Sequence, residues 1–120
     1  MDIQARIREY TDWLYSGFTA TKVGEYYELT TPYLDRLNDH LQIYVRQEPN
    51  GTYFLTDDGY IIRNLISSGV SFSRSQKRRN MLEHIARNFG VSVNGNNLEV
   101  HASKSNYPQK KHMLLQTMMT

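Results

Sequence analysis

The sequence contains no cysteine, which excludes disulfides, thiolate metal ligands and a cysteine nucleophile. No apolar run approaches the roughly 20 residues that a transmembrane helix needs, and the N-terminal residues lack the apolar core of a signal peptide. The sequence also lacks a glycine-rich phosphate loop, a GxSxG turn and a histidine pair with metal-ligand spacing. These absences favour a cytoplasmic protein with no membrane partner and no cofactor or metal, and they leave the common enzyme classes without a motif.

The 120 residues are enough for one domain with a modest core, and we expect a single α+β domain over residues 1–120. The formal net charge of +2 is too small to indicate a nucleic-acid partner by itself. Nine tyrosines, four phenylalanines and one tryptophan add bulky side chains that combine apolar rings with polar groups.

Hydrophobic periodicity predicts the first half of the chain. Residues 2–17 read as an amphipathic helix whose apolar stripe is formed by Ile3, Ile7, Tyr10 and Leu14. Two short strands follow over 18–23 and 25–31, and Pro32 is expected to end the second because proline cannot donate to a ladder. The clearest signal is a hairpin, in which apolar residues alternate over 41–46 and return over 52–56 around a Pro-Asn-Gly turn.

Capping residues and turns divide the second half. Helices are predicted over 59–67 and from Ser73 to Phe89, and a small hairpin over 91–93 and 98–102 surrounds an Asn-Gly turn. A last helix begins near Tyr107. The order is α-β-β-β-β-α-α-β-β-α, which indicates an α+β fold with a small, mostly antiparallel sheet, an N-terminal helix, two middle helices and a C-terminal helix.

Four carboxylates flank the central hairpin and form the first candidate site: Asp35, Asp39, Asp57 and Asp58. If the two ends of the hairpin meet, such oxygen ligands could hold Mg²⁺ or Mn²⁺ for phosphodiester hydrolysis. Aspartates are used more often in helix caps and turns, which is the interpretation we favour here. The acidic-spacer-lysine strand of restriction-type nucleases is also absent.

A basic helix provides the second candidate, a phosphate-binding surface. Its cations are Arg74, Lys77, Arg78 and Arg79, and Lys110 and Lys111 could extend it. The alternative is an ordinary solvated helix face on which Arg79 and Arg87 each pair with Glu83.

Aromatic residues of the predicted strands provide the third candidate: Tyr26, Tyr44, Tyr53 and Phe54. On an outer sheet face, Tyr44 and Tyr53 could stack bases or contact a protein. If the terminal helices cover that face, the rings belong to the core, and the sequence leaves both arrangements open.

Four blocks of sequence occur in a recognisable order: TTPYLDRLNDHLQIYV, FLTDDGYII, NFGVSVNGNNLEV and NYPQKKHMLLQ. Together they resemble an uncharacterised domain-of-unknown-function family of bacteria, prophages and other mobile elements. Its members are usually the N-terminal half of a two-domain protein. The resemblance therefore implies a mobile-element setting and a possible continuation beyond Leu114–Thr120 into a second domain.

These observations lead to a functional expectation. We expect a non-catalytic phage or mobile-element module that docks on a host nucleic-acid-processing protein, such as a defence nuclease, or on nucleic acid, for example as an inhibitor. The alternatives are a metal-dependent phosphodiesterase built on the four aspartates and an accessory domain that serves a missing partner domain. A homodimer is a further expectation, for which the apolar Met118-Met119 end is one candidate seam.

Overall fold

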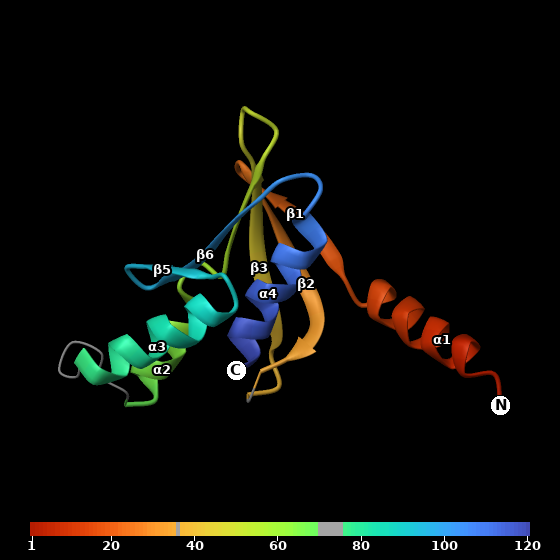
Figure 1. Ribbon diagram of the computed structural model, residues 1–120, viewed down its shortest axis with the longest axis horizontal. Coiled ribbons are helices and arrows are strands. Elements are labelled where there is room, and N and C mark those ends of the chain that lie inside the picture. Colours follow the sequence, from red (N-terminus) through yellow and green to blue (C-terminus); the bar gives the residue numbers. More distant parts are fainter. Residues whose placement is uncertain (36, 70–75) are drawn as a thin grey trace.

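The computed structural model describes residues 1–35, 37–69 and 76–120, and these form four helices and one six-stranded sheet (Figure 1). In chain order the elements are α1 (Ile3–Ser16), β1 (Thr19–Val23), β2 (Tyr26–Leu34), β3 (His40–Gln47), β4 (Tyr53–Thr56), α2 (Tyr60–Ser67), α3 (Gln76–Asn88), β5 (Ser92–Asn94), β6 (Asn97–Ala102) and α4 (Tyr107–Met119). The predicted order and the α+β class are confirmed.

The strands lie in the order β1-β2-β3-β4-β6-β5, and neighbouring strands pair antiparallel. The β3–β4 hairpin lies at the centre, where alternation buries Leu41, Ile43 and Val45 on one face. Its turn is stabilised by Asn50, whose side-chain oxygen accepts from the Thr52 backbone N–H at 3.1 Å. The hairpin predicted from the sequence is therefore the central pair of the sheet.

Helices α3 and α4 pack on the buried face of the sheet. Leu114, Leu115 and Met118 of α4 join the core formed by β3, β4 and β6, and Figure 1 shows α4 running along these strands. Helix α3 packs against β5, with Ala86 buried. Met118 is thus a core residue, whereas its neighbour Met119 remains partly exposed.

Strand β2 differs from the prediction at its end. We expected Pro32 to stop it after residue 31, but β2 continues to Leu34. The pairing of β2 with β3 is irregular between Thr30 and Leu34, so the ladder does not require a backbone donor at Pro32. The expected stop was wrong because proline is tolerated at such an irregularity.

Helix α1 forms as predicted but does not join the core. Asp2 caps it by accepting the backbone N–H groups of Gln4 and Ala5 at 3.1 and 3.2 Å. None of its residues is buried, and Figure 1 shows the helix projecting away from the sheet. One interpretation of the aromatic residues required both terminal helices to cover the sheet. Because α1 projects away, only α4 does so.

Candidate functional site

Asp57 is a structural residue at the corner between β4 and α2. Its side chain is fully buried, and Oδ1 accepts the backbone N–H groups of Gly59 and Leu98, both at 2.9 Å. Oδ2 accepts the N–H of Ile61 at 3.1 Å. Burial raises the pKa of the Asp57 carboxyl above its ordinary value, and the three backbone donors act in the opposite direction. The carboxylate thus ties the start of α2 to β6.

The other three aspartates do not complete a metal site with Asp57. Asp35 accepts the backbone N–H groups of Leu37 and Asp39 at 2.8 and 3.0 Å, and the Tyr60 hydroxyl also donates to it. The side chains of Asp39 and Asp58 are exposed. Within residues 1–35, 37–69 and 76–120 no three His, Asp or Glu side chains form a group that could hold a metal ion. Asp35 and Asp57 have the cap and turn roles that we favoured.

The basic residues of α3 do not form one free surface. Arg74 lies outside the described residues. Arg79 pairs with Glu83 at 3.2 Å and also donates to the carbonyl oxygen of Gly95, so its guanidinium ties α3 to the β5–β6 turn. Lys77 is exposed, and Arg78 lines a pocket described below. The expected Arg79–Glu83 pair is therefore present, and Arg79 has a structural role.

The two lysines of α4 do not extend that surface. The Lys111 Nζ lies 4.6 Å from the ring centre of Phe18 and 5.9 Å from that of Tyr107. Burial among these groups lowers the pKa of Lys111. The amine of Lys110 lies next to Gly90, just past the last turn of α3 and therefore at the other end of that helix from Lys77.

The predicted aromatic residues are divided between the two faces of the sheet. Tyr53 faces α4, with its ring centre 5.1 Å from that of Tyr107. Tyr26 and Phe54 lie on the opposite face, where the guanidinium of Arg46 is 5.1 Å from each ring centre. Tyr53 is thus a packing residue, whereas the other rings belong to a partly exposed network.

Tyr44 belongs to the same outer network, which carries acidic residues. Its hydroxyl donates to Glu28 at 3.1 Å, and burial together with Glu28 raises the pKa of Tyr44. Glu99 shares this face through the strand register, and Glu48 pairs with Arg46 at 2.9 Å. Carboxylates next to the rings would repel phosphates, so this face is poorly suited to nucleic acid.

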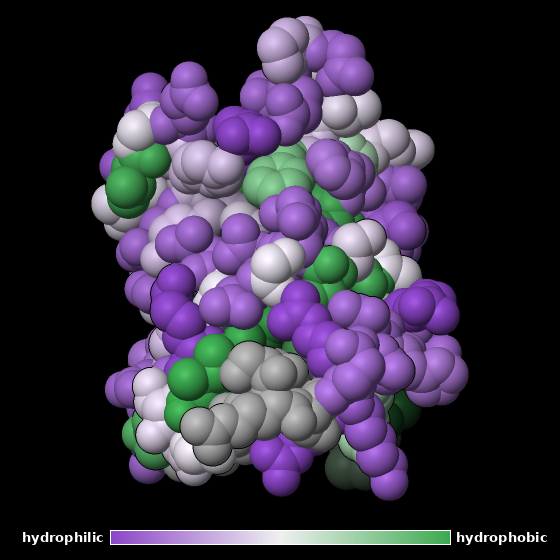
Figure 2. Space-filling model, turned by 90° about the vertical axis from the view of Figure 1, so that its left-hand side faces the viewer, coloured by the Kyte–Doolittle hydropathy of each residue, from purple (hydrophilic) through white to green (hydrophobic). Residues whose placement is uncertain are grey.

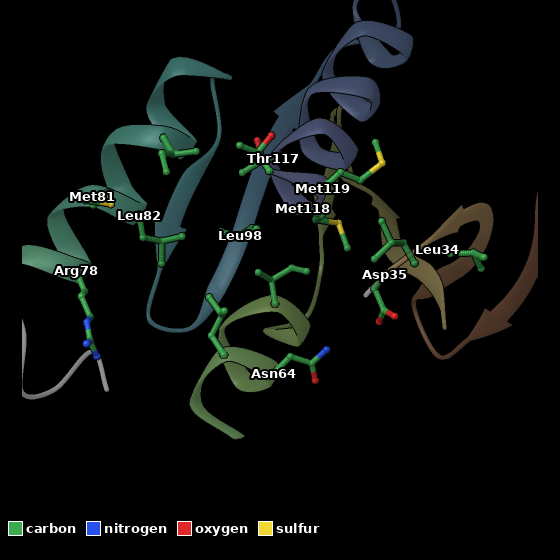
Figure 3. Close-up of a pocket in the computed structure, with 15 residues that line it drawn as sticks. Leu34, Asp35, Asn64, Arg78, Met81, Leu82, Leu98, Thr117, Met118 and Met119 are labelled. Atoms are coloured by element: carbon green, nitrogen blue, oxygen red, sulfur yellow. The ribbon is translucent and has the colours of Figure 1, made fainter. Parts of the chain in front are cut away.

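An apolar pocket lies between α2, α3 and the C-terminal turns of α4. Its volume is about 590 Å³. Figure 3 shows side chains from these three helices, from β6 and from the end of β2 lining the same space. Its apolar residues are Leu34, Leu41, Ile61, Leu65, Met81, Leu82, Ile85, Leu98, Met118 and Met119, and its polar residues are Asp35, Asn64, Arg78, Thr117 and Thr120.

The pocket opens to solvent at its methionines. Met81 is 57% exposed and Met119 is 42% exposed. In Figure 3, Arg78 and Asp35 lie on opposite sides of the apolar space, and Figure 2 shows apolar side chains on the molecular surface among hydrophilic ones. Met81, Leu82 and Ile85 have the spacing of an apolar helix stripe, which looks the same in the sequence whether it packs fully or lines a pocket.

Fold and site together define an α+β domain with an apolar pocket between its helices. The chain belongs to the family described as domain of unknown function DUF1828, whose model matches residues 31–120. All the residues that line the pocket lie within the matched part, whereas α1 and β1 precede it. No curated protein and no solved structure matches the chain. Among the described helices, none is both long and apolar enough to cross a membrane.

Proposed function

We propose that this chain is a non-catalytic protein-binding module, and that the pocket between α2, α3 and α4 receives an apolar anchor from an amphipathic helix of its partner. The observation that carries the proposal is the pocket itself. Its volume of about 590 Å³ falls within the usual range of binding pockets, and its lining is largely aliphatic. Apolar grooves between helices commonly bind the apolar face of a partner helix.

The chemistry of the rim supports a protein ligand. Met81 and Met119 are unbranched and polarisable, so they can adjust to an anchor of irregular shape. Arg78 and Asp35 lie on opposite sides of the apolar space, and the Asp35 carboxylate is already held by Leu37, Asp39 and Tyr60.

The positions and contacts of the basic side chains favour a protein partner over nucleic acid. The Arg79 guanidinium is bonded within the fold, and Lys111 packs against Phe18 and Tyr107. Lys77 and Lys110 lie at opposite ends of α3. Phosphate binding gains affinity from several cations that act together, and this arrangement separates them.

The partner class comes from the resemblance to a family of prophages and other mobile elements. In that setting we propose that the module docks on a nucleic-acid-processing protein of the bacterial host, such as a defence nuclease, and inhibits it. In longer relatives the pocket domain would be followed by a second domain. The alternative of a metal-dependent phosphodiesterase has no support from the aspartates, because Asp57 is committed to three backbone donors.

Two methionines of α4 provide a matched test. Met119 lines the pocket and Met113 does not, and their exposures are 42% and 37%. A photo-crosslinking residue would be placed at position 119 or 113 and the protein added to host lysate. The expected result is a host protein that crosslinks from position 119 but not from position 113. This crosslink should be lost when Met81→Glu is added to the position-119 probe.

The contrary results are equally concrete. Equal crosslinking from both positions, or capture that survives Met81→Glu, would show that the pocket is not the binding site. A gel-shift titration at two salt concentrations tests the other partner class. Strong DNA binding that falls steeply with salt and weakens in Lys77→Glu would replace the protein partner with nucleic acid.

A further inference from the structure

We propose that the two methionines at the opening of the pocket, Met81 and Met119, are a reversible oxidation site, and that their oxidation by peroxide weakens the binding of an apolar ligand. The inference rests on the proposed function, because it concerns the regulation of the same pocket. Met81, Met118 and Met119 all line that pocket. Figure 3 shows Met81 on α3 and Met119 on α4, so thioethers from two different helices border one apolar space.

The sulfur chemistry of this chain is confined to its methionines. The sequence contains five methionines and no cysteine, so it offers an oxidant thioethers and no thiol. Hydrogen peroxide transfers one oxygen atom to a thioether: the peroxide O–O bond breaks, the S=O bond forms and water leaves. The sulfur loses two electrons and the peroxide gains them. Reductases return the sulfoxide to methionine, so the change is reversible.

Exposure separates the methionines at the opening from the one beneath it. Met81 is 57% exposed and Met119 is 42% exposed, whereas Met118 is 7% exposed and belongs to the core. Peroxide therefore reaches the two outer side chains without entering the core. Because neither outer side chain is buried in the fold, a polar oxygen on it remains in contact with water. Oxidation thus changes the opening of the pocket and leaves the fold intact.

The oxidised opening is polar where the reduced opening is apolar. A methionine side chain is flexible and apolar, and its sulfoxide is polar. An apolar ligand that covers the sulfoxide must remove water from its oxygen, which costs free energy. Arg78 lies three residues before Met81 on the same side of α3 and lines the same pocket. Its guanidinium is a hydrogen-bond donor near the oxygen that forms at position 81, which favours keeping that oxygen at the opening.

Oxidation of the full chain, resolved for each methionine, tests the proposal. The methionine methyl groups would be labelled and followed by NMR, and the probe of the pocket is anilinonaphthalene sulfonate, a dye that binds apolar surface. In the reduced chain the dye should shift the methyl signals of Met81 and Met119. After dilute hydrogen peroxide these two should be sulfoxides and Met118 should be unmodified. The affinity of the pocket for the dye should fall by about tenfold or more, and a methionine sulfoxide reductase should restore it.

Leucine variants supply the matched controls. Combining Met81→Leu with Met119→Leu keeps the opening apolar but removes both thioethers, so dye binding should survive peroxide. Met113→Leu removes a methionine of α4 that is 37% exposed and does not line the pocket, so this variant should remain sensitive. The melting temperature of the wild-type chain should be the same before and after oxidation, because the core methionine is spared.

Several results would overturn the proposal. They are a reduced chain in which the dye shifts neither Met81 nor Met119, equal dye affinity before and after oxidation, a peroxide-dependent loss that persists in the double leucine variant, and a melting temperature that falls with oxidation. The dye assay uses no host protein, so its outcome is separate from that of the crosslinking test. A response of the dye to oxidation without a crosslink from position 119 would leave the oxidation site standing and remove the protein partner.

Discussion

Replacing Asp57 with asparagine should destabilise the fold through one identifiable mismatch. The substitution keeps the shape of the side chain but replaces one carboxylate oxygen with an amide NH2 group. If the remaining oxygen keeps the two donors on Oδ1, from Gly59 and Leu98, the amide faces the N–H of Ile61. An orphaned buried donor costs about 1–3 kcal/mol, and the loss of negative charge weakens the two remaining bonds. The expected loss of unfolding free energy is about 2–4 kcal/mol.

The neighbouring aspartate supplies the control. Asp58 is exposed and has a backbone φ of 55°, a conformation that asparagine tolerates well, so Asp58→Asn should change stability by less than about 0.5 kcal/mol. Urea unfolding should be followed by far-ultraviolet circular dichroism, because the single tryptophan, Trp13, lies on exposed α1 and does not report on the core. Equal midpoints for the two variants would refute the reasoning that Asp57 ties α2 to β6.

Three further substitutions test other contacts by the same urea assay. Arg79→Ala should lower the unfolding free energy by about 1–2 kcal/mol, because it removes the ion pair with Glu83 and the hydrogen bond to the β5–β6 turn. The control Lys77→Ala should lower it by less than about 0.5 kcal/mol. Equal losses in the two variants would contradict the structural role of Arg79. Tyr60→Phe should cost about 1–2 kcal/mol by removing the hydroxyl bond to the β2–β3 loop, and no loss would argue against that bond. For Lys111, the folded-state pKa lies below the ordinary value of 10.5, so this side chain binds more protons in the unfolded chain between the two values. Its own contribution to stability therefore rises with pH in that window. Lys111→Met should abolish this rise, and a rise that persists in the variant must come from another group.

The elements could be predicted because their signals are local. Asp2 before an amphipathic stripe and the Asn-Gly turn at residues 50–51 act within a few residues of the backbone that they shape. The structure confirms the helices and hairpins that these signals predicted. Pro32 is the informative failure, since the rule that proline ends a strand does not apply where the pairing of β2 with β3 is irregular.

The sites could be predicted only in part. Asp57 was singled out from the sequence, and its cap role was the favoured interpretation. Its third donor, the N–H of Leu98, lies 41 residues away and has no local signal. The pocket was missed because Met81 and Met119 lie on helix stripes that resemble core residues.

The sequence by itself determined the order of helices and strands, the antiparallel hairpins and the absence of thiol chemistry, because these depend on composition and on neighbours along the chain. Only the tertiary structure decided that Tyr53 packs under α4, that Lys111 packs against aromatic rings and that α1 remains uncovered. Strand register and helix docking bring together residues that are distant in the sequence. Whether a side chain becomes core, a tether or an exposed surface depends on those partners.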